Sequence, residues 1–130
     1  EGRDLLLNAV QWEGGLTPGK IKSIVKACLD IHKERVKPHL FFEEVPQPDF
    51  IRERLKEKET VIIELYSAIL NHSTGIRIPD NRIGARMMYE VLERLIHRYL
   101  VHFLPEMGEN EFIMQTADMI SRYLFVDDNA

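Results

Sequence analysis

Cys28 and His32 are the residues of this sequence whose types and spacing come nearest to a chemical site. The two lie four positions apart, so they occupy one face of a helix, one turn from each other. A thiolate–imidazole pair or half of a metal site would use this spacing. A buried thiol beside a histidine that lines the core or a cavity is the commoner arrangement, and we expect it here.

The other residues able to do chemistry do not form a pattern. Glu93 and His97 are spaced i, i+4, whereas di-iron helical bundles use a glutamate and a histidine at i, i+3. His97 and His102 lie about 140° apart around a helix, so they do not converge. The sequence has no second cysteine, no His-Glu-x-x-His and no phosphate-binding glycine loop. We therefore expect no enzyme, no metal site and no cofactor.

The elements that position these residues are helices. Residues 21–32 carry apolar side chains at steps of three and four, with lysines on the opposite side. Thr17 is expected to cap this helix, and Pro18 fits its first position. The lysine-rich side is expected to be a solvated face, although a patch for nucleic acid or an acidic ligand is the alternative.

Three further long segments have the same periodicity, and Asp80 is a good N-cap for the second of them. The first has one apolar stripe that runs from Ile51 through Leu55 to Ile69. The short run 76–78 lies between glycine and proline and is expected to be a loop. The prediction is an all-α antiparallel bundle of about five to six helices, with long helices over 21–32, 48–72, 80–105 and 108–124 and short ones over 5–12 and 38–45.

Composition limits the classes of protein further. The 130 residues suffice for one domain, residues 1–130. With 17 basic and 21 acidic residues the net charge is −4, which argues against nucleic-acid binding by this chain alone. The single cysteine excludes an internal disulfide and suggests either a reducing compartment or indifference to oxidation, and we expect a cytoplasmic protein. No apolar run approaches the roughly 18 residues of a membrane span.

The last two long segments have apolar arcs wider than one packing face. In residues 87–100 adjacent apolar pairs recur on every turn. Such a helix is either buried centrally in its own domain or packs on one side within the domain and on the other against a second copy.

Several passages resemble the ligand-binding domain of TetR-family transcriptional regulators, which are bacterial proteins. The passage 39–48, with its leucine, aromatics, Glu43-Glu44 and prolines, leads into a helix with arginines at its start. The loop 75–80 and the ending 120–124 are also similar, and the likeness extends from Leu16 to Phe125.

The resemblance implies the regulatory half of a DNA-binding protein. On this expectation the N-terminal helix-turn-helix module is absent from the sequence, and residues 1–15 are what remains of the connecting helix. A small apolar or amphipathic effector would release a repressor from DNA. The family's effector cavity would be lined by Trp12, Cys28, His32, Tyr66, Met88 and Leu92. Its last two helices would form a homodimer through Met87, Val91, Leu95, Tyr99, Phe112, Thr116, Ile120 and Tyr123. The alternative is a stand-alone dimeric helical interaction module without a ligand.

Overall fold

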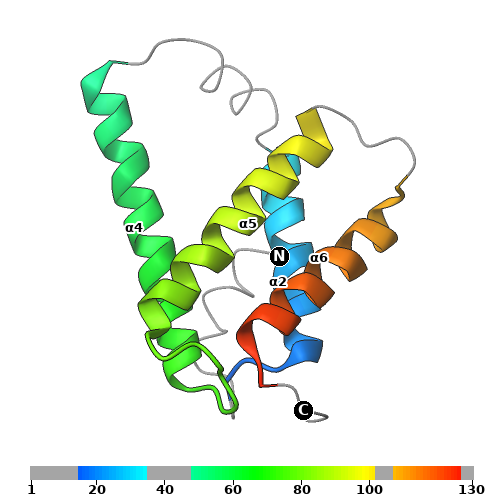
Figure 1. The fold of residues 1–130 in the computed structure, drawn as a ribbon. Helices are drawn as coiled ribbons and strands as arrows, with labels where there is room; N and C mark the ends of the chain where they lie inside the picture. Colours follow the sequence, from blue (N-terminus) through cyan, green and yellow to red (C-terminus); the bar gives the residue numbers. More distant parts are fainter. Residues whose placement is uncertain (1–14, 35–47, 102–106, 127–130) are drawn as a thin grey trace.

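Four helices make up most of the computed structural model, which describes residues 15–34, 48–101 and 107–126. They are α2 (Pro18–Glu34), α4 (Asp49–Asn71), α5 (Asn81–Val101) and α6 (Glu109–Leu124) (Figure 1). Within the described residues there is no strand, only an isolated bridge between Ile76 and Phe125. The all-α prediction is confirmed. The described part holds four helices rather than five to six, and the short helices predicted over 5–12 and 38–45 lie outside it.

The predicted helix starts agree with the local hydrogen bonds. α2 begins at Pro18, and the backbone N–H of Lys20 lies 3.3 Å from the Thr17 hydroxyl, as in a side-chain N-cap. Before α5, the Asp80 carboxylate accepts a hydrogen bond of 2.9 Å from the backbone N–H of Arg82. These caps satisfy N–H groups that have no acceptor within their own helix.

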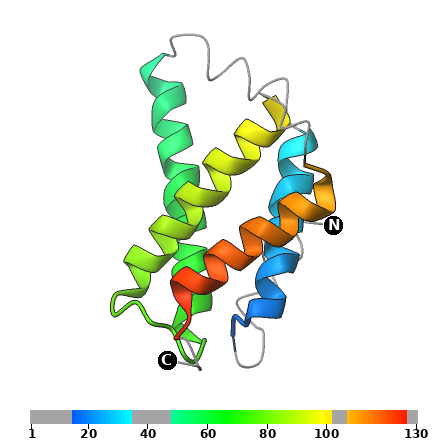
Figure 2. The ribbon, with the colours of Figure 1, turned by 45° about the vertical axis from the view of Figure 1, so that its right-hand side comes forward.

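The helices alternate in direction, so that α2 and α5 run one way and α4 and α6 the other (Figures 1 and 2). α4 packs mainly on α5, and α2 mainly on α6, while α5 also contacts α2 and α6. α5 is therefore the helix shared by both sides of the bundle. The central side chains between these helices are almost fully enclosed, among them Ile21, Ile24, Leu29, Ile69, Leu70, Leu92, Ile96 and Leu124.

The α4–α5 loop is fastened to the end of α6. The backbone N–H of Arg77 donates to the carbonyl of Leu124 at 2.7 Å, and that of Val126 donates to Gly75 at 2.9 Å. The guanidinium of Arg77 also donates to the Tyr123 carbonyl at 2.8 Å and lies 5.3 Å from the centre of the Tyr123 ring. Residues 76–78 are thus a loop, as predicted. The isolated bridge between Ile76 and Phe125, together with the Arg77 side chain, holds this loop against the end of α6.

The entry to α2 is fixed against the end of α4. The backbone N–H of Leu16 donates to the Ser73 hydroxyl at 2.6 Å, and Leu16 is buried. Gly15 has φ +68°, and a Cβ atom built on it would lie 2.5 Å from the carbonyl carbon and oxygen of His72. Only glycine fits a left-handed conformation with a neighbouring backbone this close.

The first half of α4 extends away from the other helices. α4 and α5 lie together near their connecting loop and diverge toward Asp49 and Val101 in both views (Figures 1 and 2). Phe50, Leu55 and Val61 are 64%, 42% and 67% exposed, and the buried residues of α4 begin at Ile63. The apolar stripe that predicts α4 is therefore enclosed by the described residues only along its second half.

Candidate functional site

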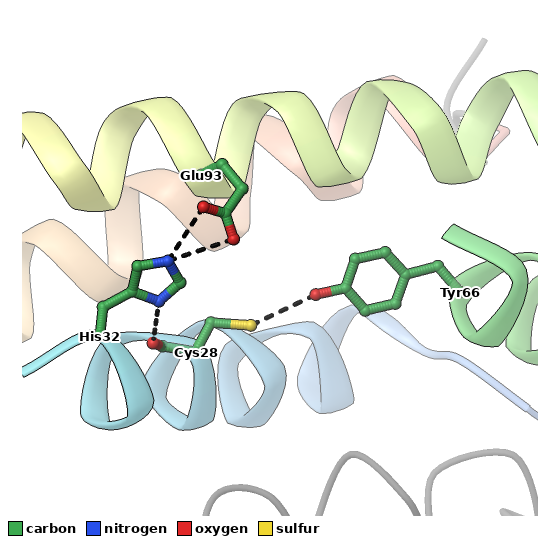
Figure 3. A network of polar contacts seen from close by, with 4 residues as sticks. All are labelled: Cys28, His32, Tyr66 and Glu93. Carbon is green, nitrogen blue, oxygen red and sulfur yellow. Dashed lines mark hydrogen bonds and ion pairs between the residues drawn. The ribbon is translucent and has the colours of Figure 1, made fainter. Parts of the chain in front are cut away.

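A network of four side chains joins α2, α4 and α5 (Figure 3). α2 supplies Cys28 and His32, one turn apart as their spacing predicts, while α4 supplies Tyr66 and α5 supplies Glu93. Cys28 contacts Tyr66, and His32 contacts Glu93. The network thus fastens one helix to two others through polar contacts beside the apolar core.

The Cys28 thiol is not poised for nucleophilic chemistry. Its Sγ lies 3.3 Å from the Tyr66 hydroxyl, and the residue is 6% exposed. Burial raises the pKa of the thiol to about 12, against a smaller lowering by the hydrogen bond with Tyr66. Because the thiolate is the reactive form, a thiol that stays neutral at physiological pH is an inert core group.

The two tyrosines near the network also remain neutral. Burial raises the pKa of Tyr66 well above its ordinary value, and the neighbouring Cys28 and Glu93 act in the same direction. Burial likewise raises the pKa of Tyr89 on α5, helped by the negative charge of Glu93. Both phenols therefore keep their protons at neutral pH, and the Tyr66 hydroxyl serves as a hydrogen-bonding group toward Cys28.

His32 makes contacts with both ring nitrogens. Nδ1 lies 2.8 Å from the backbone carbonyl oxygen of Cys28, and Nε2 lies 3.1 Å from each carboxylate oxygen of Glu93. The His32 and Glu93 side chains are 14% and 28% exposed. Because both ring nitrogens face oxygen atoms, the geometry does not support the thiolate–imidazole interpretation.

Five of the six residues predicted to line an effector cavity are buried or half-buried in the described bundle. Cys28, His32 and Tyr66 belong to the polar network, and Met88 and Leu92 are buried in the core cluster that also contains Cys28 and Tyr66. Trp12 lies outside the described residues.

Glu93 belongs to this site but was not among the predicted site residues. From its spacing in the sequence, Glu93 was paired only with His97, as potential metal ligands. A signal was available: Glu93 directly follows Leu92, so a charged residue borders the buried stripe of α5. Nothing in the spacing indicates that a residue 61 positions from His32 is its partner.

The predicted dimer residues divide into two groups. Phe112, Thr116 and Ile120 are only 2–3% exposed, because this face of α6 packs inside the subunit. These three side chains are therefore covered by helices of the same chain. Tyr99 is also engaged within the subunit, where its ring stacks on Phe112 with centroids 4.3 Å apart. Tyr99 is partly exposed, as are Val91, Leu95 and Tyr123, and Met87 is exposed.

A shallow surface groove of about 330 Å³ lies between α4 and α5, away from the polar network. Ile63, Ile83 and Met87 form its apolar part, and Arg82 and Arg86 line it as well. Arg82 pairs with Glu64, and Arg86 with Glu59 and Glu90. None of the predicted effector-lining residues contributes to this groove.

Two searches of the described residues concern metals and membranes. No group of three histidine, cysteine or carboxylate side chains among them could hold a metal ion. No helix in these parts of the chain is long and apolar enough to cross a membrane. Comparison of the sequence and structure with protein-family models, curated proteins and solved structures gave no significant match.

Proposed function

We propose that this chain is the effector-sensing and homodimerising domain of a TetR-like transcriptional regulator. The order of the family-like passages and the all-α fold support the proposal. The observation that carries it is a set of apolar side chains on α5 and α6 that stay partly or fully exposed: Met87 and Met119 are about half exposed, and Val91, Leu95 and Tyr123 pack only partly against the core. Such a surface is typical of an interface between copies of a chain.

The proposed interface uses one face of each helix. On α5, Met87, Val91 and Leu95 are spaced i, i+4, i+8 and so lie along one edge, with Met87 44% exposed. On α6, Met119 and Tyr123 are spaced i, i+4, with Met119 50% exposed. Two-fold pairing would bring each helix pair against its mate as a four-helix bundle and remove these side chains from water.

The effector is proposed to bind where α2, α4 and α5 meet, beside the network of Cys28, His32 and Tyr66. A ligand that prefers one arrangement of these helices shifts the population toward it. Because α5 contributes both to this region and to the proposed dimer face, the shift would alter the spacing of two DNA-reading modules linked to the domain. A change in their spacing moves them out of register with paired half-sites on DNA.

The dimer is tested by sedimentation velocity at micromolar concentration with a matched pair of variants. Met119→Glu places a charge on the proposed interface, whereas Met114→Glu places one on the same helix about 140° away. Met114 is 49% exposed and Met119 50%, so the two substitutions should affect the stability of the single subunit equally. We expect wild type and Met114→Glu to be dimers and Met119→Glu to dissociate. A monomeric wild-type domain, or dissociation by Met114→Glu alone, would contradict the proposal.

Effector sensing separates the proposal from a stand-alone interaction module. A ligand that binds only the native state stabilises it by mass action, by about 2.7 kcal/mol at one hundred times its Kd. Thermal unfolding of the domain with a panel of apolar and amphipathic molecules measures this directly. Stabilisation by a panel member that Leu92→Trp abolishes would support an effector site. A dimer that responds to no member of the panel would favour the module without a ligand.

A further inference from the structure

We propose that His32 and Glu93 form a proton-dependent bridge that fastens the end of α2 to α5 only while the imidazole is doubly protonated (Figure 3). The proposal concerns the folded domain itself and does not depend on the regulatory function proposed above.

Both ring nitrogens of His32 face hydrogen-bond acceptors. Nδ1 lies 2.8 Å from the backbone carbonyl oxygen of Cys28, which can only accept. Nδ1 must therefore carry a hydrogen. Nε2 lies 3.1 Å from both carboxylate oxygens of Glu93, which in the ionised form can also only accept. Both contacts are satisfied together only by the imidazolium, since a neutral imidazole has one N–H.

The position of His32 favours the charged ring further. It lies in the last turn of α2, where the unsatisfied carbonyl groups give the helix end a partial negative charge. The neighbouring cation, Lys33, is engaged by Glu109 of α6 at 2.6 Å. Burial of the ring, which is 14% exposed, opposes the charge, but the carboxylate beside it is itself sheltered and weakly screened.

All four helices place titratable groups near this pair. α2 presents the neutral thiol of Cys28, and α4 presents the neutral phenol of Tyr66. α5 carries Tyr89 one turn before Glu93 and His97 one turn after it. α6 contributes Glu109 through its ion pair with Lys33. Among the described residues that face His32, Glu93 is thus the carboxylate in direct contact.

Loss of one proton breaks the bridge. If Nδ1 keeps its hydrogen, the lone pair of Nε2 points at two carboxylate oxygens and repels them. If Nε2 keeps it, the contact with the Cys28 carbonyl is lost instead. An imidazole ordinarily titrates near pH 6.5, so the bridge is formed in mildly acidic solution and lost as the pH rises. The bridge therefore stabilises the folded state in mildly acidic solution, and this stabilisation is lost in alkaline solution.

The proposal is tested by urea unfolding of the full chain between pH 5.5 and 8.5. Wild type is compared with His32→Gln, whose side chain can still donate but does not titrate, and with His72→Gln, which changes an exposed histidine. Between the two ends of the range the folding equilibrium constant of wild type should fall about tenfold more than that of His32→Gln, equivalent to about 1.4 kcal/mol. His72→Gln should follow wild type. Parallel curves for wild type and His32→Gln would overturn the proposal.

A measurement on the folded wild-type protein keeps the test independent of variant stability. Nitrogen-15 NMR of the histidine rings distinguishes an imidazolium from either neutral tautomer. At pH 6 the His32 ring should carry two protons, and in Glu93→Gln it should lose one of them at lower pH than in wild type. A His32 ring with a single proton at pH 6 in wild type, or an unchanged titration in Glu93→Gln, would overturn the proposal.

Discussion

Replacement of Gly15 by alanine should destabilise the domain by about 2–4 kcal/mol. A left-handed backbone costs a residue with a Cβ about 1–2 kcal/mol, and alanine recovers about 0.4–1 kcal/mol by restricting the unfolded chain. Steric overlap adds more, because the new Cβ would lie 2.5 Å from the backbone carbonyl of His72 and from the Ser73 hydroxyl. Relief of the overlap must displace the hydrogen bond between Leu16 and Ser73, worth about 1 kcal/mol.

Two other glycines separate conformational strain from overlap. Gly75 has φ +74°, but the nearest atom to its added Cβ is a Phe125 ring carbon at 3.9 Å. Gly75→Ala should therefore destabilise the domain by only about 1 kcal/mol, which is the cost of the left-handed backbone minus the gain from a restricted unfolded chain. Gly19 lies in the first turn of α2 with nothing within 4 Å of its added Cβ. Gly19→Ala should therefore stabilise the domain, by up to about 1 kcal/mol.

The assay is urea unfolding followed by circular dichroism at 222 nm, with the free energy of unfolding extrapolated to water. The expected order of stability is Gly19→Ala, wild type, Gly75→Ala and then Gly15→Ala. Equal losses for Gly15→Ala and Gly75→Ala would refute the close approach between the start of α2 and the end of α4. A gain for Gly15→Ala would refute its left-handed conformation as well.

Two further predictions concern the core. Leu92→Ala should cost about 2–5 kcal/mol in urea unfolding, since Leu92 is 2% exposed, whereas Val61→Ala at a 67% exposed position should change stability by less than about 0.5 kcal/mol; equal effects would contradict the described core. Cys28 should make wild type lose stability between about pH 9 and 12, because its unfolded thiol ionises near its ordinary pKa of 9.0 while the folded thiol holds its proton up to a pKa of about 12. In denaturant unfolding across this pH range, the free energy of unfolding should fall less steeply with pH for Cys28→Ser than for wild type. Identical slopes would show that the folded thiol ionises normally.

Local signals in the sequence were sufficient to place the helices. Thr17 with Pro18, and Asp80 before the next long segment, are residue choices whose effect depends only on neighbours along the chain. The observed starts agree with these residues, because α2 begins at Pro18, directly after Thr17, and α5 begins at Asn81, directly after Asp80. Exposure along α4 was less predictable. The stripe through Leu55 indicates a helix, but whether another element covers it depends on where the rest of the chain packs.

For α6, too, the sequence predicts the helix but does not predict what covers its apolar side chains. A wide apolar arc indicates how much of a helix avoids water, and it does not indicate whether the covering side chains come from the same subunit. Phe112, Thr116 and Ile120 are covered by the chain's own helices, whereas Met119 lies outside that arc.

The polar network was predictable only in part. Cys28 and His32 share a helix face by spacing alone, and their proximity is confirmed. The partners of these two residues come from other helices, at Tyr66 and Glu93. Contacts between distant positions depend on helix packing, and periodicity in one sequence carries no information about them.

The single bridge between Ile76 and Phe125 has a consequence for the order of folding. The α4–α5 hairpin can form early because its helices are neighbours along the chain, whereas this bridge joins positions 76 and 125 and must await the docking of α6. The amide hydrogens of Arg77 and Val126, each bonded across it, should therefore become protected from solvent exchange late in folding. In the native protein they should exchange through local opening of this end, ahead of amides in the middle of α5.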